Sequence, residues 1–506
     1  MNLLKRAVAL AATAAFALAQ CAPSIAAQHD APLDLNLPSL GTVAGADLSL
    51  LDERRLGEQI MTKVRADADF LADPEAIDYL NRLGYRLIAA SHTIPYDFFF
   101  FPVRDKSLNA FALPGGFIAV HTGLVVAAKT ESELAAVMGH EIGHVTQRHI
   151  ARMFQQAEGS LAMTIGSFLL ALLAARAGGS SGGNAAAAIT MGTQAALIQK
   201  QLAYSRDAER EADRVGLQSL TNAGFDPKGM EDFFARLQQS SRYYETIATS
   251  YISTHPMTSE RMNDMQGRTR RLGRRPHADS FDFLLIQARL RVLQEKNYDG
   301  WLSASRSFLL QLETAAGPRA AALHYGLSVA YTKMNRKADA LRHARLAQQG
   351  ASGHSVILDK NLAQVEFANA SGKDGKRAAL KLARETVDRY PYSLMAAEAY
   401  VDMLHEMGMN EQVVKFMRRQ KAIPKDNTDY HALLARSYHE LGRHAEAFAA
   451  TGEMYAIAGN HKAAVYQFDL AQRANDADYY VMSMIDAKLR EQRRLALDEE
   501  KARKGK

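Results

Sequence analysis

The feature that most constrains the fold of this 506-residue chain is the sequence HEIGH at residues 140–144. On an α-helix, residues four apart lie on one face, so His140 and His144 can bind a single metal ion. Glu141 then lies beside the metal, where a carboxylate can accept a proton from water. A capping box formed by Thr130 and Glu133 predicts where this helix begins. The alternative is a chance arrangement of these residues on an ordinary amphipathic helix.

A second helix is predicted at residues 204–216, followed by a helix-ending Gly224. A catalytic zinc usually has three protein ligands and keeps a fourth position for water, so one more ligand is needed. Glu209 and Asp213 are four residues apart and share one face of this helix. Glu209 can bind the metal, while Asp213 can accept the outer N–H of a ligating histidine. The alternative is a solvated helix whose acidic and arginine side chains pair along its surface.

These two motifs together, with the run from Tyr204 to Gly216, resemble the M48 peptidases, which are zinc enzymes of the gluzincin group. The segment NAFALPGG at residues 109–116 is also similar to this family, and the resemblance covers about residues 50–270. It implies one Zn²⁺ per chain. It also implies a role for each residue of the motifs, with Glu141 as catalytic base, Asp213 as the partner of a ligand, and three zinc ligands: His140, His144 and Glu209.

The same resemblance implies a hairpin and an edge strand just ahead of the zinc helix. We expect an extended substrate to add to this edge as a further strand, along four residues: Phe117, Ile118, Ala119 and Val120. Stabilisation of the oxyanion by groups other than zinc is left open, with Arg206 and Arg261 as candidates.

The sequence Thr254-His255-Pro256, with Arg261 following, resembles a motif of those periplasmic M48 peptidases that carry helical repeats after the peptidase domain. The resemblance implies that His255 is a candidate fourth zinc ligand that holds the enzyme inactive. The alternative is a loop histidine with a local hydrogen bond.

The N-terminus predicts export. Lys5 and Arg6 precede an apolar stretch at residues 7–19, and small residues offer a cleavage site near residue 27, so residues 1–27 are predicted to be a secretory signal peptide. Cys21 would suit a lipoprotein, but Gln20 stands before it where a small residue is expected. Cys21 is the only cysteine, so the mature chain would form no disulfide. Together with the motifs above, this predicts an enzyme of a Gram-negative periplasm.

An apolar interval separates the two predicted metal-binding helices. Residues 161–175 and 185–198 are almost wholly apolar and flank a Gly/Ser-rich break at residues 178–183. Each run is shorter than the roughly 20 residues that a membrane-spanning helix requires. The interval at 155–200 is then a buried helical hairpin, a lid over the active site, or a segment in reversible contact with a membrane. We favour a lid that packs on the peptidase and makes peripheral contact with the outer membrane.

The second half of the chain is predicted to be helical, with Ala- and Leu-rich segments from about residue 280 onwards. Expected helix-joining positions are spaced 39, 34 and 34 residues apart, near the 34-residue period of tetratricopeptide (TPR) repeats, at Asn335, Asp374, Gly408 and Gly442. A non-repeating helical bundle is the alternative. The expected fold is mainly α. An α+β zincin-type peptidase domain with a small sheet (28–270) precedes an all-α TPR solenoid (271–490) and a basic tail (491–506).

The formal net charge is +6 and becomes +4 without the signal peptide, and no nucleic-acid-binding module is found, so no nucleic-acid partner is expected. The resemblance implies a periplasmic zinc endopeptidase that degrades or helps to assemble misfolded outer-membrane proteins, with TPR repeats that dock on the β-barrel assembly machinery. One alternative is a chaperone or adaptor whose repeats do most of the work. Another is a structural zinc protein, which would not need Glu141.

Overall fold

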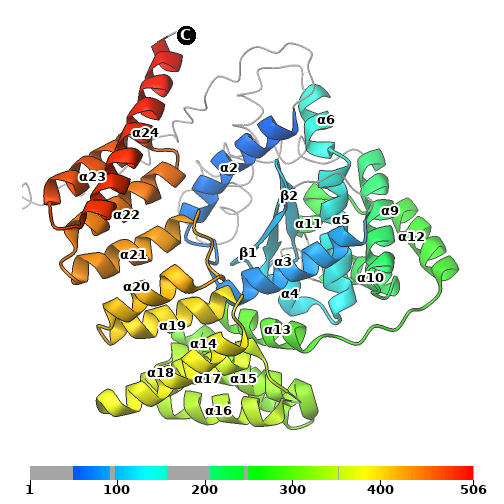
Figure 1. Cartoon of the computed structure of the whole chain (residues 1–506). Helices are drawn as coiled ribbons and strands as arrows, with labels where there is room; N and C mark the ends of the chain where they lie inside the picture. The colour runs from blue at the N-terminus through cyan, green and yellow to red at the C-terminus, as the bar shows by residue number, and fades with distance from the viewer. Residues whose placement is uncertain (1–48, 92–96, 157–205, 244–248, 352, 505–506) are drawn as a thin grey trace, which may run out of the picture.

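The computed structural model describes residues 49–91, 97–156, 206–243, 249–351 and 353–504 (Figure 1). The predicted signal peptide and most of the predicted lid lie outside the described residues, so both stay predictions. Within the described ranges, no helix combines the length and the apolar character needed to cross a bilayer.

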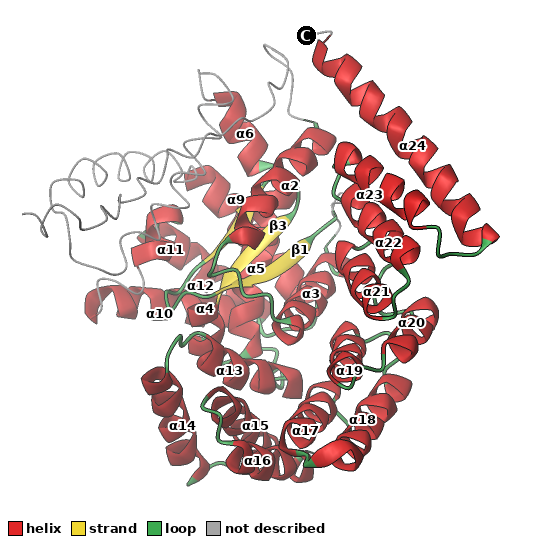
Figure 2. Cartoon of the chain, turned by 90° about the vertical axis from the view of Figure 1, so that its left-hand side faces the viewer, coloured by secondary structure: helices red, strands yellow, loops and turns green. Residues whose placement is uncertain are grey.

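A three-stranded sheet lies at the centre of the N-terminal half, which is predicted to be the peptidase half (Figure 2). Its strands are β1 (Phe99–Val103), β2 (Ala110–Leu113) and β3 (Phe117–His121), in the spatial order β1-β3-β2. β2 and β3 form the predicted hairpin and pair antiparallel, whereas β1 pairs with β3 in parallel.

The prediction that Phe117, Ile118, Ala119 and Val120 form an edge strand is wrong. These residues form most of β3, the central strand, and all four are buried. β1 occupies the side of β3 that the hairpin leaves free, and a parallel pairing of this kind has no local sequence pattern. The outer edge of β1 is covered in turn, since the amide of Leu71 donates to the carbonyl of Pro102. The edge strand beside the metal-binding helix is therefore β2.

The HEIGH sequence lies on α5 (Glu131–Thr146), and every residue of this helix is buried. Thr130 caps the helix as predicted, because its side chain accepts a hydrogen bond from the amide of Glu133. The Glu133 carboxylate reaches the amide of Lys129 and the guanidinium of Arg236. Helices pack around α5 and the sheet, and their bounds are α2 (Leu50–Ala66), α3 (Pro74–Ala89), α4 (Thr122–Ala127), α6 (His149–Gln156), α9 (Arg206–Asn222), α10 (Lys228–Tyr243), α11 (Thr249–Thr254) and α12 (Ser259–Leu272).

Helices α5 and α9 approach each other closely enough that their backbones touch. A Cβ atom added to Gly216 of α9 would lie 2.8 Å from the amide nitrogen of His140, and one added to Gly143 of α5 would lie 3.0 Å from Cα of Ala212. Small residues at the crossing therefore let α9 present its acidic side chains directly to the two histidines of α5.

The second half of the chain is a series of antiparallel helical hairpins that curves around the N-terminal half (Figures 1 and 2). Left-handed backbone at Asn335, Gly408 and Gly442 turns the chain between paired helices, as predicted. Asp374 was misplaced, because it lies inside a helix and the turn occurs at Gly372. The helices are α13 (Phe281–Leu293), α14 (Tyr298–Leu312), α15 (Gly317–Lys333), α16 (Lys337–Gly350), α17 (Val356–Asn369), α18 (Gly372–Arg389), α19 (Leu394–Glu406), α20 (Asn410–Arg419), α21 (Thr428–Glu440), α22 (His444–Ile457), α23 (His461–Ala474) and α24 (Tyr479–Lys504).

The two halves share one hydrophobic core, which runs from α2 to α19. α13 packs on α3 and α4, and the hydroxyl and amide of Ser280 at its start donate to the buried Glu131 of α5. The expected boundary at 270/271 falls inside α12, and the expected basic tail is the end of the continuous helix α24. The helical half is thus a TPR-type solenoid built directly onto the N-terminal half.

Candidate metal centre and active site

Four side chains that the sequence singled out converge at one point. His140 and His144 come from α5, Glu209 from α9, and His255 from the residue that follows α11. All four are buried, and each offers one ligand atom within 4.8 Å of the other three. They form the only such group of histidine and acidic side chains among the described residues.

The spacing of these atoms fits a tetrahedral metal ion. Nε2 of His140 lies 3.0 Å from Nε2 of His144 and 3.3 Å from Nδ1 of His255. Oε1 of Glu209 lies 3.3 Å from Nε2 of His144 and 3.0 Å from Nδ1 of His255. Ligands about 2.0–2.1 Å from a tetrahedral centre are separated from one another by about 3.3 Å. His255, the candidate fourth ligand, lies within this group of candidate ligand atoms.

Glu141 adjoins this group without belonging to it. Its carboxylate is fully buried, and Oε1 lies 3.5 Å from Nε2 of His255. The pKa of Glu141 is raised, because the effect of burial outweighs the lowering effects of His255, His140 and the backbone of Ala112 in β2. Its position between the metal ligands and the edge strand is the one that a proton-transferring base requires.

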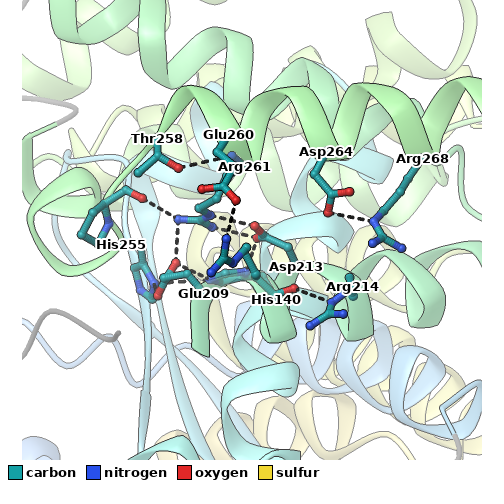
Figure 3. A network of polar contacts seen from close by, with 12 residues as sticks. His140, Glu209, Asp213, Arg214, His255, Thr258, Glu260, Arg261, Asp264 and Arg268 are labelled. Carbon is teal, nitrogen blue, oxygen red and sulfur yellow. Dashed lines mark hydrogen bonds and ion pairs between the residues drawn. The ribbon is translucent and has the colours of Figure 1, made fainter. Parts of the chain in front are cut away.

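Asp213 lies behind His140, where the role predicted for it would place it. Its Oδ1 lies 2.9 Å from Nδ1 of His140, which leaves Nε2 of that ring to face the other ligands. The guanidinium of Arg261, from α12, donates to both Asp213 oxygens at 2.7 Å and lies 2.7 Å from Oε2 of Glu209 (Figure 3). It also donates to the carbonyl of Pro256 at 2.9 Å.

Arg261 therefore fixes the ligands and has no free donor face for an oxyanion, which removes it as a candidate for that role. Its side chain is 2% exposed, and its carboxylate partners raise its pKa even though burial opposes this. Arg206, the other candidate, lies at the exposed start of α9. Of the two arginines, only Arg206 stays a candidate for this role.

The acidic partners control protonation of the metal-free site. Burial alone would lower the pKa of His140, but hydrogen bonds to Asp213 and Glu209 raise it to about 10. Burial drives the pKa of His144 well below its usual range. The pKa of Glu209 lies well below its usual range, because the surrounding histidines outweigh the effect of burial. The Glu209 carboxylate is therefore an anion. The imidazole of His144 is ready to bind metal, whereas the imidazole of His140 must first lose a proton.

Three neighbours of the ligands were missed in the sequence. The ring of Tyr251 stacks on His255 at a centroid distance of 4.6 Å and an angle of 27°. His149 contacts His144, and Glu211 contacts His149. Tyr251 on α11 lies four residues before His255, so this spacing of one helical turn was the signal available for it.

Comparison with known proteins agrees with this site. Residues 74–269 match Peptidase family M48. The beta-barrel assembly-enhancing protease of Escherichia coli (strain K12) is 30% identical over 462 residues, which cover 90% of each chain. The chain belongs to peptidase family M48. Within that family it falls in the group of beta-barrel assembly-enhancing proteases, and it is therefore a metallopeptidase.

Other relatives agree with this assignment. The beta-barrel assembly-enhancing protease of Yersinia pestis is 31% identical over 91% of this chain and 92% of its own. A Vibrio cholerae protein of the same group is 41% identical over 276 residues, and the match spans about half of that protein, 54% of its length. Among solved structures, the TPR protein YrrB matches 40% of this chain and 91% of its own at 17% identity, with a TM-score of 0.22. The TPR assignment here depends on the helical hairpins and their turns.

Proposed function

We propose that this M48 peptidase is a zinc endopeptidase that binds one Zn²⁺ through His140, His144 and Glu209. The observation that carries the proposal is the tetrahedral spacing of buried imidazole and carboxylate atoms around one point. Nitrogen and carboxylate donors in a tetrahedral set are typical of zinc. Cysteine, the usual ligand of structural zinc, does not contribute, which favours a catalytic over a structural site.

When bound, zinc supplies a Lewis acid that polarises the scissile carbonyl and lowers the pKa of a water molecule. Glu141 then takes a proton from the attacking water and passes it to the leaving amine. Asp213 holds the ring of His140 in the tautomer that presents Nε2, and Arg261 holds Asp213 and Glu209 in place.

We place the substrate on β2 instead of β3. The amide of His121 donates to the carbonyl of Asn109, so in the antiparallel pattern Phe111 bonds to β3 and the polar backbone groups of Ala110 and Ala112 face outwards. The backbone of Ala112 lowers the pKa of the Glu141 carboxylate, so this part of β2 lies next to Glu141. A substrate strand added at this edge would pass directly beside the base.

His255 makes the resting site a closed one. Its Nδ1 takes the fourth position of the ligand set, and its Nε2 faces Glu141, so one imidazole occupies both the place of the attacking water and the vicinity of the base. We propose that the enzyme is latent until His255 moves away. Latency suits a protease placed among unfolded proteins in transit.

The proposed compartment is the periplasm, supported by the predicted signal peptide at residues 1–27. The proposed substrates are misfolded or stalled outer-membrane proteins, which the enzyme degrades or helps to assemble. The names of the Escherichia coli and Yersinia pestis relatives support a role in the assembly of β-barrel proteins. The TPR-type half is the proposed docking surface for the β-barrel assembly machinery, because such solenoids form concave surfaces for partner proteins. Contact of the 155–200 interval with the membrane, as part of a lid, is proposed on its apolar sequence alone.

A second candidate function is that of a chaperone or adaptor whose proteolysis is secondary. The closed ligand set favours it, since a resting chain with four protein ligands leaves no room for water. The two functions differ in whether Glu141 is needed when misassembled outer-membrane proteins accumulate.

The test is the variant Glu141→Gln. The amide is nearly the same size but cannot accept the proton, so we expect normal zinc content and, in the His255→Ala background that opens the site, a loss of proteolysis of unfolded proteins by several orders of magnitude. Zinc is measured by elemental analysis and proteolysis by casein cleavage with and without a chelator. In a deletion strain, complementation by this variant equal to that by the parent would favour the adaptor function over the peptidase function. Substantial turnover by the purified variant would remove Glu141 from its role.

A further inference from the structure

One buried histidine next to the metal ligands has no part in the mechanism above. His149 is the first residue of α6 and is 3% exposed. Its Nδ1 lies 2.9 Å from Nδ1 of His144, and its Nε2 lies 3.1 Å from Oε2 of Glu211 on α9. His149 thus stands behind a metal ligand, on the side away from the metal.

The three side chains admit only one consistent arrangement of protons. The Nε2 atom of His144 faces the other ligand atoms, so in the metal-bound state its lone pair is used there and its proton lies on Nδ1. That N–H donates to Nδ1 of His149, which must therefore be an acceptor. A neutral His149 then carries its own proton on Nε2 and donates it to the Glu211 carboxylate.

We propose that His149 and Glu211 form a positioning pair for the ligand His144, equivalent to what Asp213 does for His140. The proposal builds on the metal site described above. A carboxylate at the end of a chain of hydrogen bonds fixes the tautomer and ring orientation of a ligating histidine and makes it a better donor to the metal. Each histidine ligand of α5 would then be held by a separate acidic residue of α9. Asp213 contacts His140 directly, and Glu211 contacts His144 through His149.

The backbone around His149 is arranged to bring this ring back to α5. Arg148 adopts a left-handed conformation with φ of 56°, which ends α5 and starts α6 at the next residue. Its guanidinium donates to the buried carboxylate of Glu53 on α2 at 2.7 and 3.0 Å. A non-glycine residue in this region needs such support from its surroundings. The turn and the ion pair together set the position of His149.

The test compares three substitutions at His149 that differ in which ring atom they replace. In His149→Asn the side-chain oxygen takes the place of Nδ1 and can accept from His144. In His149→Gln the amide takes the place of Nε2 and reaches Glu211 but not His144. His149→Ala keeps neither contact. Zinc affinity of each purified full-length protein is measured by competition with a chromophoric chelator, and the folding of the metal-free protein by thermal unfolding.

We expect His149→Ala and His149→Gln to bind zinc about 10- to 100-fold more weakly than the parent, and His149→Asn to recover much of that loss. Glu211→Gln, which keeps an acceptor but removes the charge, should lose affinity by a smaller factor. If volume alone mattered, glutamine would preserve affinity better than asparagine. That order, or unchanged affinity in His149→Ala, would overturn the proposal.

The chain offers a matched control in its helical half. His343 is also buried, and its Nδ1 lies 3.0 Å from Nδ1 of His324, far from the metal site. His343→Asn and His343→Gln create the same chemical change in a similar histidine pair. They should leave zinc affinity unchanged even where they lower the unfolding temperature. An equal loss of affinity in these controls would show that the effect at His149 comes from general destabilisation, and the proposal would fail.

Discussion

At the scale of single residues, the proton on His140 links metal binding to pH. The pKa of this imidazole in the metal-free protein is about 10, because Asp213 and Glu209 outweigh the effect of burial. Below that pKa the ring is protonated, and zinc must displace the proton in order to bind. We expect the zinc affinity to rise with pH by up to about tenfold per unit between roughly pH 6 and 9. Competition with a chelator of known pH dependence measures this slope, and a flat profile would contradict the proton assignment.

A second residue-scale prediction concerns latency. Replacing His255 by alanine opens the fourth position and removes the ring that faces Glu141, while the other three ligands and the base stay in place. We therefore expect His255→Ala to retain zinc, more weakly, and to cleave casein or itself at least about tenfold faster than the parent. The double variant His255→Ala/Glu141→Gln serves as the inactive control. A single variant no more active than the parent would leave His255 without an inhibitory role.

At the scale of helices, the site depends on how closely α5 and α9 approach. A methyl group on Gly216 would lie 2.8 Å from the backbone nitrogen of His140, so one helix would have to move. We expect Gly216→Ala to lower the free energy of unfolding by about 1–3 kcal/mol and to weaken zinc binding. Gly267→Ala on α12 is the matched control, because nothing lies within 4 Å of its added Cβ and the change should be neutral or stabilising by up to about 1 kcal/mol. Urea denaturation measures the free energy of unfolding of both variants. Equal values for the two would show that α5 and α9 can move apart without loss of stability.

The helix scale also shows what the sequence could reveal. The cap at Thr130, the two metal-binding faces and the turns at Gly408 and Gly442 depend on residues a few positions apart, and all of these were predicted. Contacts between segments that are distant in the sequence were harder to predict. The parallel pairing of β1 with β3 has no local pattern, so the edge of the sheet was assigned to the wrong strand. The ion pair of Arg261 with Asp213 joins two residues that are 48 positions apart in sequence, and only the folded chain brings them together.

At the scale of the whole molecule, a buried network of ion pairs and hydrogen bonds connects the helical half to the peptidase half. Glu75, at the start of α3, is fully buried and receives the hydroxyl of Tyr325 from α15 and the ammonium of Lys360 from α17. Arg289 of α13 lies 3.2 Å from the same carboxylate and 2.7 Å from Asp73. These contacts cross a hydrophobic core that is continuous between the halves. We infer that the two halves unfold together rather than as separate domains.

The two halves carry independent probes, so this inference can be tested. Trp301 on α14 is the only tryptophan and reports on the helical half, whereas zinc release reports on the peptidase half. In the parent protein, urea denaturation followed by the two probes should give one coincident transition. Lys360→Met leaves the Glu75 carboxylate buried without one of its cations, and we expect it to cost about 3–5 kcal/mol and to separate the two transitions. Lys381→Met, at an exposed ion pair within α18, should change stability by less than about 0.5 kcal/mol and keep the transitions together. Separate transitions in the parent would mean that the shared core does not couple the two halves.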